Sequence, residues 1–343
     1  MPLELKMPLQ PMEALSVDEI PEGDEWQYEP KWDGFRCLVF RDRTLIQLQS
    51  KAGQPLTRYF PELVAAFEKI KTNTFVLDGE IVVSVNGILS FDDLLMRIHP
   101  AESRVRKLAQ QHPATFIAFD LLANDRGKSL LDQKLTDRRA LLEEFASKNL
   151  PDSDLIQLSP ATTDVKMARK WFKTAGADID GIVAKRGDFK YRSGDRTGMQ
   201  KIKPIRSVDC VVGGFRYAAK GKLVGSLLLG LYDDEERLNH VGFCSSFKAT
   251  EKSSLTKKLE PLVRPPGFTG RAPGGPSRWS TERSSEWNPL APKLIVEVAY
   301  DHFTGGRFRH GTKLLRWRPD KLPEQCKMDQ IKTGLRSAQS LLK

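Results

Sequence analysis

Lys31 opens the hexapeptide KWDGFR, residues 31–36, whose residue types suit phosphoryl chemistry. A lysine amine attacks phosphorus only when it is neutral, and an ordinary pKa of about 10.4 keeps it protonated near pH 7. We therefore expect burial or cationic neighbours to lower the pKa of Lys31. Gly34 would let the backbone pass close to a ligand, and Arg36 would grip phosphate oxygens bidentately. A strand end carrying a surface lysine is the alternative for these six residues alone.

Two carboxylate motifs follow along the chain. Asp78-Gly79-Glu80 interrupts the apolar segment 75–85, and Asp180 begins a motif of a carboxylate, a glycine, a short apolar strand and the cation Lys185. Charged groups in such segments are costly unless they are paired, metal-bound or at the mouth of a cleft. If the carboxylates of these two motifs converge on one cleft, they would hold Mg²⁺ near a nucleotide phosphate. Each motif alone is also typical of a turn at a strand boundary.

Two cationic motifs complete the set. Lys201 and Lys203 would share one face of a strand and, beside Arg196, would form a phosphate clamp. Alternating lysines are also ordinary on a solvated strand. The second motif is Arg316-Trp317-Arg318-Pro319-Asp320-Lys321.

The elements that must position these residues change in character near residue 207. Before it, apolar patterns predict alternating strands and helices, with strands over 26–28, 37–41, 45–49, 75–85 (broken at residues 78–79), 115–122 and 181–185, and helices over 60–71, 90–98, 101–111, 136–149 and 164–177. After it, short strands over 208–215, 223–232, 238–247 and 294–300 predict a small antiparallel barrel. Residues 264–292 predict a long loop, either a plain linker or one that touches nucleic acid.

The charge is divided unevenly along the 343 residues. Residues 1–203 carry 30 Lys and Arg against 30 Asp and Glu, so the later residues supply the whole net charge of +10. This division indicates a catalytic body followed by a module that grips a polyanion, with solubility as the plainer explanation. The length suits two domains, and no stretch of 18 apolar residues indicates a membrane span. Four scattered cysteines and the lack of a signal-peptide pattern favour a reducing intracellular compartment.

Taken in order, these motifs resemble the covalent nucleotidyltransferase superfamily of polynucleotide ligases and mRNA capping enzymes. The nearest likeness is to the small bacterial ATP-dependent DNA ligases of repair, and it runs from about residue 8 to 325. It implies an α+β fold, with a nucleotidyltransferase (adenylation) domain of antiparallel sheets and flanking helices over 1–204, an OB-fold β-barrel over 205–325 and a tail over 326–343. The sequence departs from the family at Asp180, where glutamate is common, at Lys51, where arginine is usual, and at Met199-Gln200, where an aromatic residue is common.

The resemblance also implies roles for individual residues. Lys31 would attack the α-phosphorus of ATP, and Arg318 and Lys321 would orient the leaving pyrophosphate. Lys201 and Lys203, with Arg196 beside them, would neutralise the α-phosphate and help lower the pKa of Lys31. Glu80 and Asp180 would contact the metal and the ribose, Glu29 would recognise the adenine and Phe119 would stack on it. Arg36 and Lys51 would hold the 5′-phosphate, and Asp33 would assist the steps on nicked DNA.

The implied cofactors are ATP and Mg²⁺, for which Mn²⁺ would substitute. The chain before Lys31 offers no room for the extra domains of larger or NAD-dependent ligases, which favours ATP. The implied partner is nicked double-stranded DNA, with DNA-repair proteins beyond it. We expect a cytoplasmic, nucleoid-associated monomer whose barrel domain moves away before DNA engages. Alternatives are an RNA ligase, a GTP-dependent capping enzyme and a catalytically silent nucleic-acid-binding scaffold.

Overall fold

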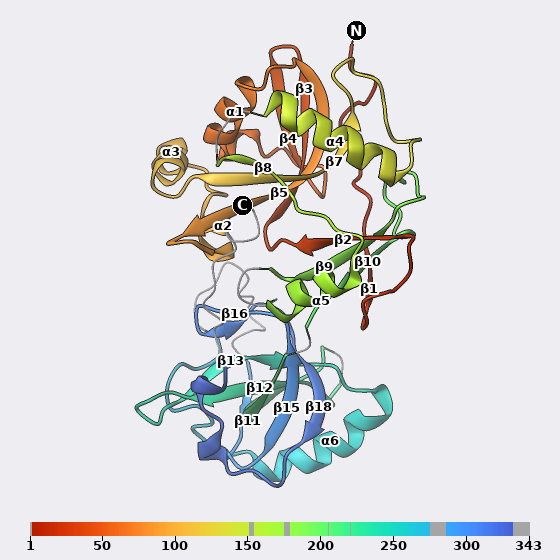
Figure 1. The fold of residues 1–343 in the computed structure, drawn as a ribbon. Helices are drawn as coiled ribbons and strands as arrows, with labels where there is room; N and C mark the ends of the chain where they lie inside the picture. The colour runs from red at the N-terminus through yellow and green to blue at the C-terminus, as the bar shows by residue number, and fades with distance from the viewer. Residues whose placement is uncertain are drawn as a thin grey trace. The chain divides into compact units, whose positions relative to one another are not determined.

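Two compact units make up the chain. The computed structural model describes residues 2–150, 154–174, 179–204, 206–219, 221–274 and 286–331. One unit lies within Met1–Pro204 and the other within Ile205–Lys332, and each has its own buried apolar core (Figure 1). Within the described ranges, no helix is long and apolar enough to cross a membrane.

The first unit contains a large mixed sheet with strand order β4-β3-β5-β7-β8. Its strands are β3 (Phe35–Asp42), β4 (Leu45–Ser50), β5 (Thr74–Val85), β7 (Ala114–Ala123) and β8 (Ile156–Leu158), with β6 (Ile88–Leu89) paired to β5. Helix α1 (Pro61–Glu68) begins with proline, whose missing N–H costs nothing in the first helical turn. Helices α1 and α4 (Leu135–Asn149) pack against β7, and α2 (Phe91–Met96) packs against β5. Helix α3 (Glu102–Gln111) packs against α1.

A smaller sheet in the same unit carries the ends of the expected catalytic motifs. Its strand order is β1-β10-β9-β2, formed by β1 (Leu15–Val17), β2 (Trp26–Lys31), β9 (Gly181–Arg186) and β10 (Met199–Ile202). Helix α5 (Val165–Thr174) packs on β2 and β9. Helix α5 was expected to extend to residue 177, but residues 175–178 lie outside the described ranges.

The expectation of purely antiparallel sheets is wrong for this unit. Strand β8 pairs parallel with β7, and β1 pairs parallel with β10. Between β7 and β8 the chain passes through α4, and such a crossover helix is the usual way to join two parallel neighbours. The expected break at Asp78-Gly79 is also wrong, because β5 runs through it, although the pairing with β7 shifts register there.

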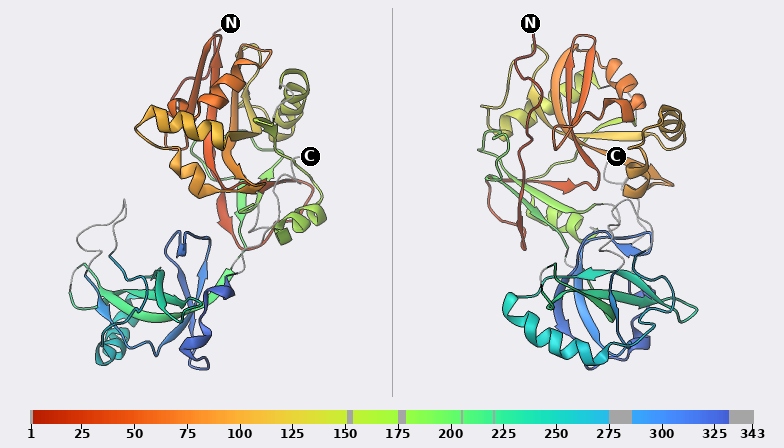
Figure 2. Two further views of the ribbon diagram at one scale, coloured as in Figure 1. Left: turned by 90° about the vertical axis from the view of Figure 1, so that its left-hand side faces the viewer. Right: turned by 180° about the vertical axis from the view of Figure 1, so that it is seen from behind.

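The N-terminal segment runs along the first unit, in red in Figures 1 and 2, and joins its core. Met12 is buried with Leu38 and Phe40, and the apolar side chains before it pack on the same cluster. Tyr191 also holds this segment at Met12, because the Met12 backbone N–H donates to the Tyr191 hydroxyl at 2.9 Å. The segment therefore supplies a fixed wall beside the large sheet.

The second unit is built on an antiparallel six-stranded sheet with the path β13-β12-β11-β15-β18 and β14 paired to β11. Its strands are β11 (Arg206–Tyr217), β12 (Val224–Tyr232), β13 (Leu238–Cys244), β14 (Asn288–Pro289), β15 (Ile295–Tyr300) and β18 (Lys313–Trp317). A separate hairpin joins β16 (Phe303–Thr304) to β17 (Arg307–Phe308), and α6 (Lys252–Leu259) packs against β12. Within the described ranges this sheet is open, so the expected closed barrel is not seen as such.

The described end of the chain belongs to the second unit. Cys326 is fully buried in its core, and the Tyr232 backbone N–H donates to the Cys326 carbonyl at 2.9 Å. Residues 326–331, assigned to a tail by the sequence analysis, therefore extend this unit beyond residue 325. The rest of that tail lies outside the described ranges, as do residues 275–285 of the expected loop over 264–292, which includes β14.

Candidate active site

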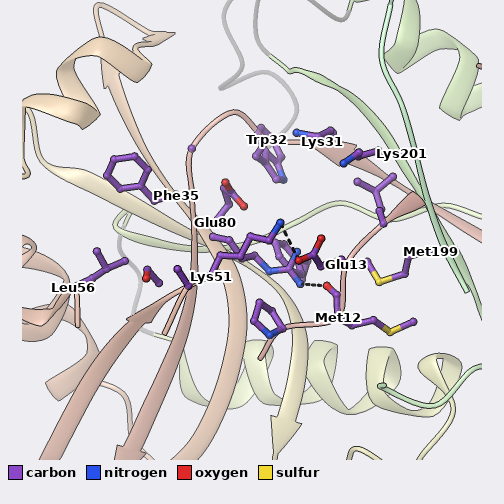
Figure 3. Close-up of a pocket in the computed structure, with 18 of the residues that line it drawn as sticks. Met12, Glu13, Lys31, Trp32, Phe35, Lys51, Leu56, Glu80, Met199 and Lys201 are labelled. Atoms are coloured by element: carbon purple, nitrogen blue, oxygen red, sulfur yellow. Dashed lines mark hydrogen bonds and ion pairs between the residues drawn. The ribbon is translucent and has the colours of Figure 1, made fainter. Parts of the chain in front are cut away.

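A cavity of about 800 Å³ opens in the first unit, where β2, β3, β5, β7 and β9 meet the N-terminal segment (Figure 3). Eight residues expected at a ligand site from the sequence line it: Glu29, Lys31, Gly34, Arg36, Lys51, Glu80, Phe119 and Lys201. Apolar side chains complete the wall, among them Phe35, Leu56, Val183 and Met199. Asp180, Lys203 and Arg196 join the site through the ion pairs described below.

Lys31 ends β2, directly opposite Gly181 of β9. The Asp180 backbone N–H donates to the Lys31 carbonyl at 2.7 Å, which holds these two residues next to each other. Gly181 has a φ of +141°, and a Cβ there would overlap the Ile202 carbonyl oxygen, so only glycine fits. The Lys31 ammonium consequently forms an ion pair with Asp180, whose side chain is 5% exposed.

The pKa of Lys31 differs from the sequence expectation. Burial lowers the pKa of its ammonium, but the charge and hydrogen bond of Asp180 and the charges of Glu80 and Asp33 outweigh burial and raise it. The prediction of a lowered pKa is therefore wrong for this arrangement, because carboxylates rather than cations lie nearest Lys31. The amine becomes a nucleophile only when these negative charges are neutralised.

Three carboxylates surround this lysine. Burial raises the pKa of Glu80 to about 7, against the opposing charges of Lys31 and Arg36. Carboxylate oxygens of Asp33 and Asp180 lie within 4.8 Å of each other. Oxygen donors at this spacing suit a hard divalent cation, so Asp33 joins Asp180 as a candidate ligand, whereas Glu80, the expected partner of Asp180, is not part of this group.

Lys201 and Lys203, expected on one face of a strand, make different contacts near Lys31, because Lys201 lies in β10 and Lys203 follows its last residue. Lys203 Nζ lies 2.8 Å from Asp180 Oδ2, the oxygen that also pairs with Lys31, so one carboxylate bridges two lysines. Lys201 lines the cavity, and burial together with the charges of Lys31, Lys51 and Lys203 lowers its pKa. Figure 3 shows the Lys31 and Lys201 side chains close to one another at the edge of the cavity.

Arg36 is anchored by a buried carboxylate. Its Nε and Nη2 donate to Asp78 Oδ1 and Oδ2 at 2.5 and 2.7 Å, and the Tyr191 hydroxyl donates to Asp78 Oδ2 at 2.7 Å. Arg36 also lies over the Phe119 ring, with Cζ 4.4 Å from the ring centre. The bidentate grip expected on a phosphate is thus made with Asp78. Gly34, expected near a ligand, also meets β5, since a Cβ there would overlap the Ile81 carbonyl oxygen.

Glu29 is almost fully buried and both of its carboxylate oxygens are engaged. Lys185 Nζ lies 2.7 Å from Glu29 Oε2, and Gln27 Nε2 donates to Oε1 at 2.8 Å. Lys185 also lies over Phe119, 4.5 Å from the ring centre. The Glu29 side chain is thus held in the cavity wall by an ion pair and a hydrogen bond. Lys185 was not among the predicted site residues, although its place at the end of the Asp180 motif offered a signal.

Glu13 gathers two cations at the mouth of the cavity. Its carboxylate oxygens lie 3.1 Å from Lys51 Nζ and 3.2 Å from Arg196 Nη2 (Figure 3 shows the first pair). Burial raises the pKa of Glu13, but the two cations outweigh it and lower the pKa overall. No motif in the sequence marked Glu13, because it lies 38 and 183 residues from its partners.

In the second unit, Arg318 and Lys321 converge on Asp209. Arg318 Nη1 donates to Asp209 Oδ1 and Oδ2 at 2.9 and 3.0 Å, and Lys321 Nζ lies 2.5 Å from Oδ2. Arg318 also contacts Asp320 and lowers the pKa of that exposed carboxyl to about 2. The two expected cations thus form one cluster around a carboxylate that the sequence analysis did not single out.

Comparison with known proteins gives concordant matches over both units. A family model described as ATP dependent DNA ligase domain matches residues 11–203, and one described as ATP dependent DNA ligase C terminal region matches residues 220–321. DNA ligase C of Mycobacterium tuberculosis (strain ATCC 25618 / H37Rv) is 42% identical over 350 residues, which cover 98% of this chain and 97% of that protein.

Two further matches are more distant. The multifunctional non-homologous end joining DNA repair protein LigD of the same strain is 31% identical over 315 residues, which cover 89% of this chain and 37% of that protein. A solved structure from a study of Lig E DNA ligases has a TM-score of 0.55 at 15% identity, covers 90% of this chain and 99% of its own, and shows the fold alone.

Proposed function

This chain belongs to the ATP-dependent DNA ligase family, and we propose that it seals nicks in duplex DNA through a Lys31–AMP intermediate, in DNA repair. The matching relatives are DNA ligases, so the RNA-ligase and capping-enzyme alternatives are not favoured. The observation that carries the proposed intermediate is the position of Lys31, which lines a cavity of about 800 Å³ beside carboxylates and further cations.

In the first step, the neutral Lys31 amine attacks the α-phosphorus of ATP. A nitrogen–phosphorus bond forms, the bond to pyrophosphate breaks and the amine releases one of its two protons, so the phosphoramidate nitrogen keeps one N–H. Lys201 and Lys203 would neutralise the α-phosphate, and Arg318 and Lys321 of the second unit would orient the pyrophosphate. Phe119 would stack on the adenine, with Val183 and Met199 supplying the apolar surface around it.

In the following steps, AMP passes to the 5′-phosphate of a nick, and the neighbouring 3′-hydroxyl displaces it. Lys51 would hold the 5′-phosphate beside Arg196, because Glu13 gathers both cations at the cavity mouth. Arg36 would act from its place over Phe119, held by Asp78. Asp33 would assist these steps on nicked DNA.

The carboxylates fit a divalent cation such as Mg²⁺ or Mn²⁺. Asp33, Asp180 and Glu80 offer only oxygen donors, which these hard cations prefer, and the first two lie within 4.8 Å of each other. A bound cation would supply charge neutralisation at the phosphate oxygens. Asp180, once it shares its charge with a cation, would hold the Lys31 proton less firmly.

The second unit is proposed to be an OB-fold module that grips DNA. Its antiparallel sheet, with α6 after β13, supports the fold assignment, and the net charge of +10 contributed after residue 203 supports the DNA contact. The role in repair is supported by the likeness to LigD, which is itself described as a DNA repair protein.

Labelled nucleotides test this proposal. The protein is incubated separately with ATP, GTP and NAD, each labelled in the AMP or GMP moiety, and then with nicked DNA. We expect covalent label from ATP alone, its loss in Lys31→Ala and its retention in Lys107→Ala, an exposed lysine of α3. The label should then transfer to DNA that carries a 5′-phosphate at the nick. Labelling of Lys31→Ala at the wild-type level would contradict the proposal.

A further inference from the structure

Asp209 holds Arg318 and Lys321 together as one cationic pair. Arg318 Nη1 and Lys321 Nζ both contact the same oxygen, Asp209 Oδ2, at 3.0 and 2.5 Å. The two nitrogens can therefore lie no farther apart than these two distances combined. At that separation, two positive charges repel each other strongly unless a negative charge lies between them.

The position of Asp209 is fixed by the sheet. It lies within β11 opposite Glu297 of β15, and its side chain is 9% exposed. The Arg318 backbone N–H donates to the Ile295 carbonyl at 2.9 Å, so the residues that carry the cations are tied to the same strands. A carboxylate on a regular strand orients its partners more firmly than one on a loop does.

The other carboxylates near Arg318 cannot replace Asp209. Asp320 contacts the opposite edge of the guanidinium through Nε and Nη2, and its side chain is 61% exposed. Glu297 Oε2 lies 3.8 Å from Arg318 Nη1 and accepts a closer hydrogen bond from Arg316, while Glu297 Oε1 accepts one from Ser207. Of the described carboxylates that pair with Arg318, Asp209 is the one that also contacts Lys321.

We propose that Asp209 is a positioning residue for the adenylation step, which holds Arg318 and Lys321 at the separation needed to grip one pyrophosphate. The inference rests on the proposed function, which gives those two cations their role. Asp209 itself need not touch the nucleotide. It acts by keeping the two repelling cations close together and by partly balancing their charge.

The test compares two steps of the reaction in the full-length protein. Asp209→Asn keeps the shape and removes the charge, and Asp209→Glu keeps the charge. Asp320→Asn removes a carboxylate that, among the described residues, pairs with Arg318 and not with Lys321. For each variant, the rate of self-adenylation and its KM for ATP are measured. Sealing of a nick that already carries 5′-AMP is measured in parallel, together with the temperature of unfolding.

We expect Asp209→Asn to slow self-adenylation by about tenfold or more, because it loses the charge that holds Arg318 and Lys321. The rate of sealing of the pre-adenylated nick should stay within about twofold of the wild-type rate. Asp209→Glu should recover part of the rate, and Asp320→Asn should change it by less than about threefold. In an Arg318→Ala, Lys321→Ala background, Asp209→Asn should slow self-adenylation no further, because it acts through those residues.

Three outcomes would overturn the inference. The first is wild-type self-adenylation by Asp209→Asn while Arg318→Ala is slow, which leaves the proposed function intact. The second is equal slowing of both steps by Asp209→Asn, or by Asp209→Glu where the asparagine variant does not fold, which indicates a purely structural role. The third is normal self-adenylation by the Arg318→Ala, Lys321→Ala protein, which also removes the proposed role of those cations.

Discussion

The Lys31 ammonium is paired with the Asp180 carboxylate across β2 and β9, and this pairing opposes the neutral amine that the chemistry requires. Asp180 and its neighbours raise the pKa of Lys31 against the effect of burial. We expect Asp180→Asn to lower the pH at which Lys31 becomes reactive. Acetic anhydride modification as a function of pH, followed by mass spectrometry of the Lys31 peptide, measures this without ATP.

Two comparisons make that experiment specific. Lys203→Met removes a cation from Asp180, so the carboxylate charge acts more strongly on Lys31 and the pH midpoint for Lys31 should rise. Modification of the exposed Lys107 in the same samples corrects for the reactivity of the reagent. An unchanged Lys31 midpoint in Asp180→Asn would show that this ion pair does not control the amine.

Glu80 predicts a stability that depends on pH. Burial raises its pKa from 4.5 to about 7 in the folded chain, so between these values the folded state binds more protons than the unfolded state. Stability contributed by the protonated carboxyl is therefore lost as the pH rises from 4.5 through 7, by at most about 3 kcal/mol. Glu80→Gln lacks this titration, so its stability relative to the wild type should increase from pH 5 to pH 8.

Urea unfolding at a series of pH values measures the effect. The informative quantity is the difference between Glu80→Gln and the wild type, because other groups titrate in both proteins. A difference that stays constant from pH 5 to pH 8 would show that the pKa of Glu80 is not raised in the folded state.

The Arg36–Asp78 pair predicts a large loss of stability on mutation. Asp78 is fully buried and accepts hydrogen bonds from Arg36 and Tyr191. Asp78→Asn leaves the Arg36 charge without its partner, which should cost about 3–5 kcal/mol of unfolding free energy. Tyr191→Phe removes the hydrogen bond to Asp78 and also the acceptor of the Met12 backbone N–H, so it should cost at least about 1.5–3 kcal/mol.

An exposed pair gives the matched control. Arg106 and Glu102 pair one helical turn apart on α3, with both side chains 71% exposed, so Arg106→Ala should cost less than about 0.5 kcal/mol. Urea unfolding monitored by fluorescence orders the three variants. Equal effects of Asp78→Asn and Arg106→Ala would contradict the structural importance given to the buried pair.

The sequence located the cavity-lining residues because their chemistry is written in short motifs. Lys31, Glu80, Phe119 and Lys201 each stand in a local pattern that predicts a strand or a strand end, and these strands do meet at one cavity. The helix Leu135–Asn149 was also predictable to within one residue of its start, because its strong helix formers stand together in the sequence.

What the sequence could not predict is the pairing of charges across distant strands. Asp209 meets cations 109 and 112 residues away, and Asp78 meets Tyr191 across 113 residues. The residue type alone does not show whether an Asp or Glu side chain pairs with a distant cation or lies in a turn. The sign of the pKa shift at Lys31 was missed for this reason, because the nearest charge could be known only from the fold.

Glu13 predicts a selective loss of substrate affinity. Its carboxylate holds Lys51 and Arg196 together at the cavity mouth, but these side chains are 57% and 66% exposed, so each ion pair contributes no more than about 1 kcal/mol. Glu13→Gln should therefore raise the KM for nicked DNA by about two- to tenfold and leave kcat within about twofold. Steady-state nick sealing measures both constants, with Glu22→Gln, which removes an exposed carboxylate paired to Arg169, as the control. A fall in kcat at unchanged KM would show instead that Glu13 acts on the chemical step.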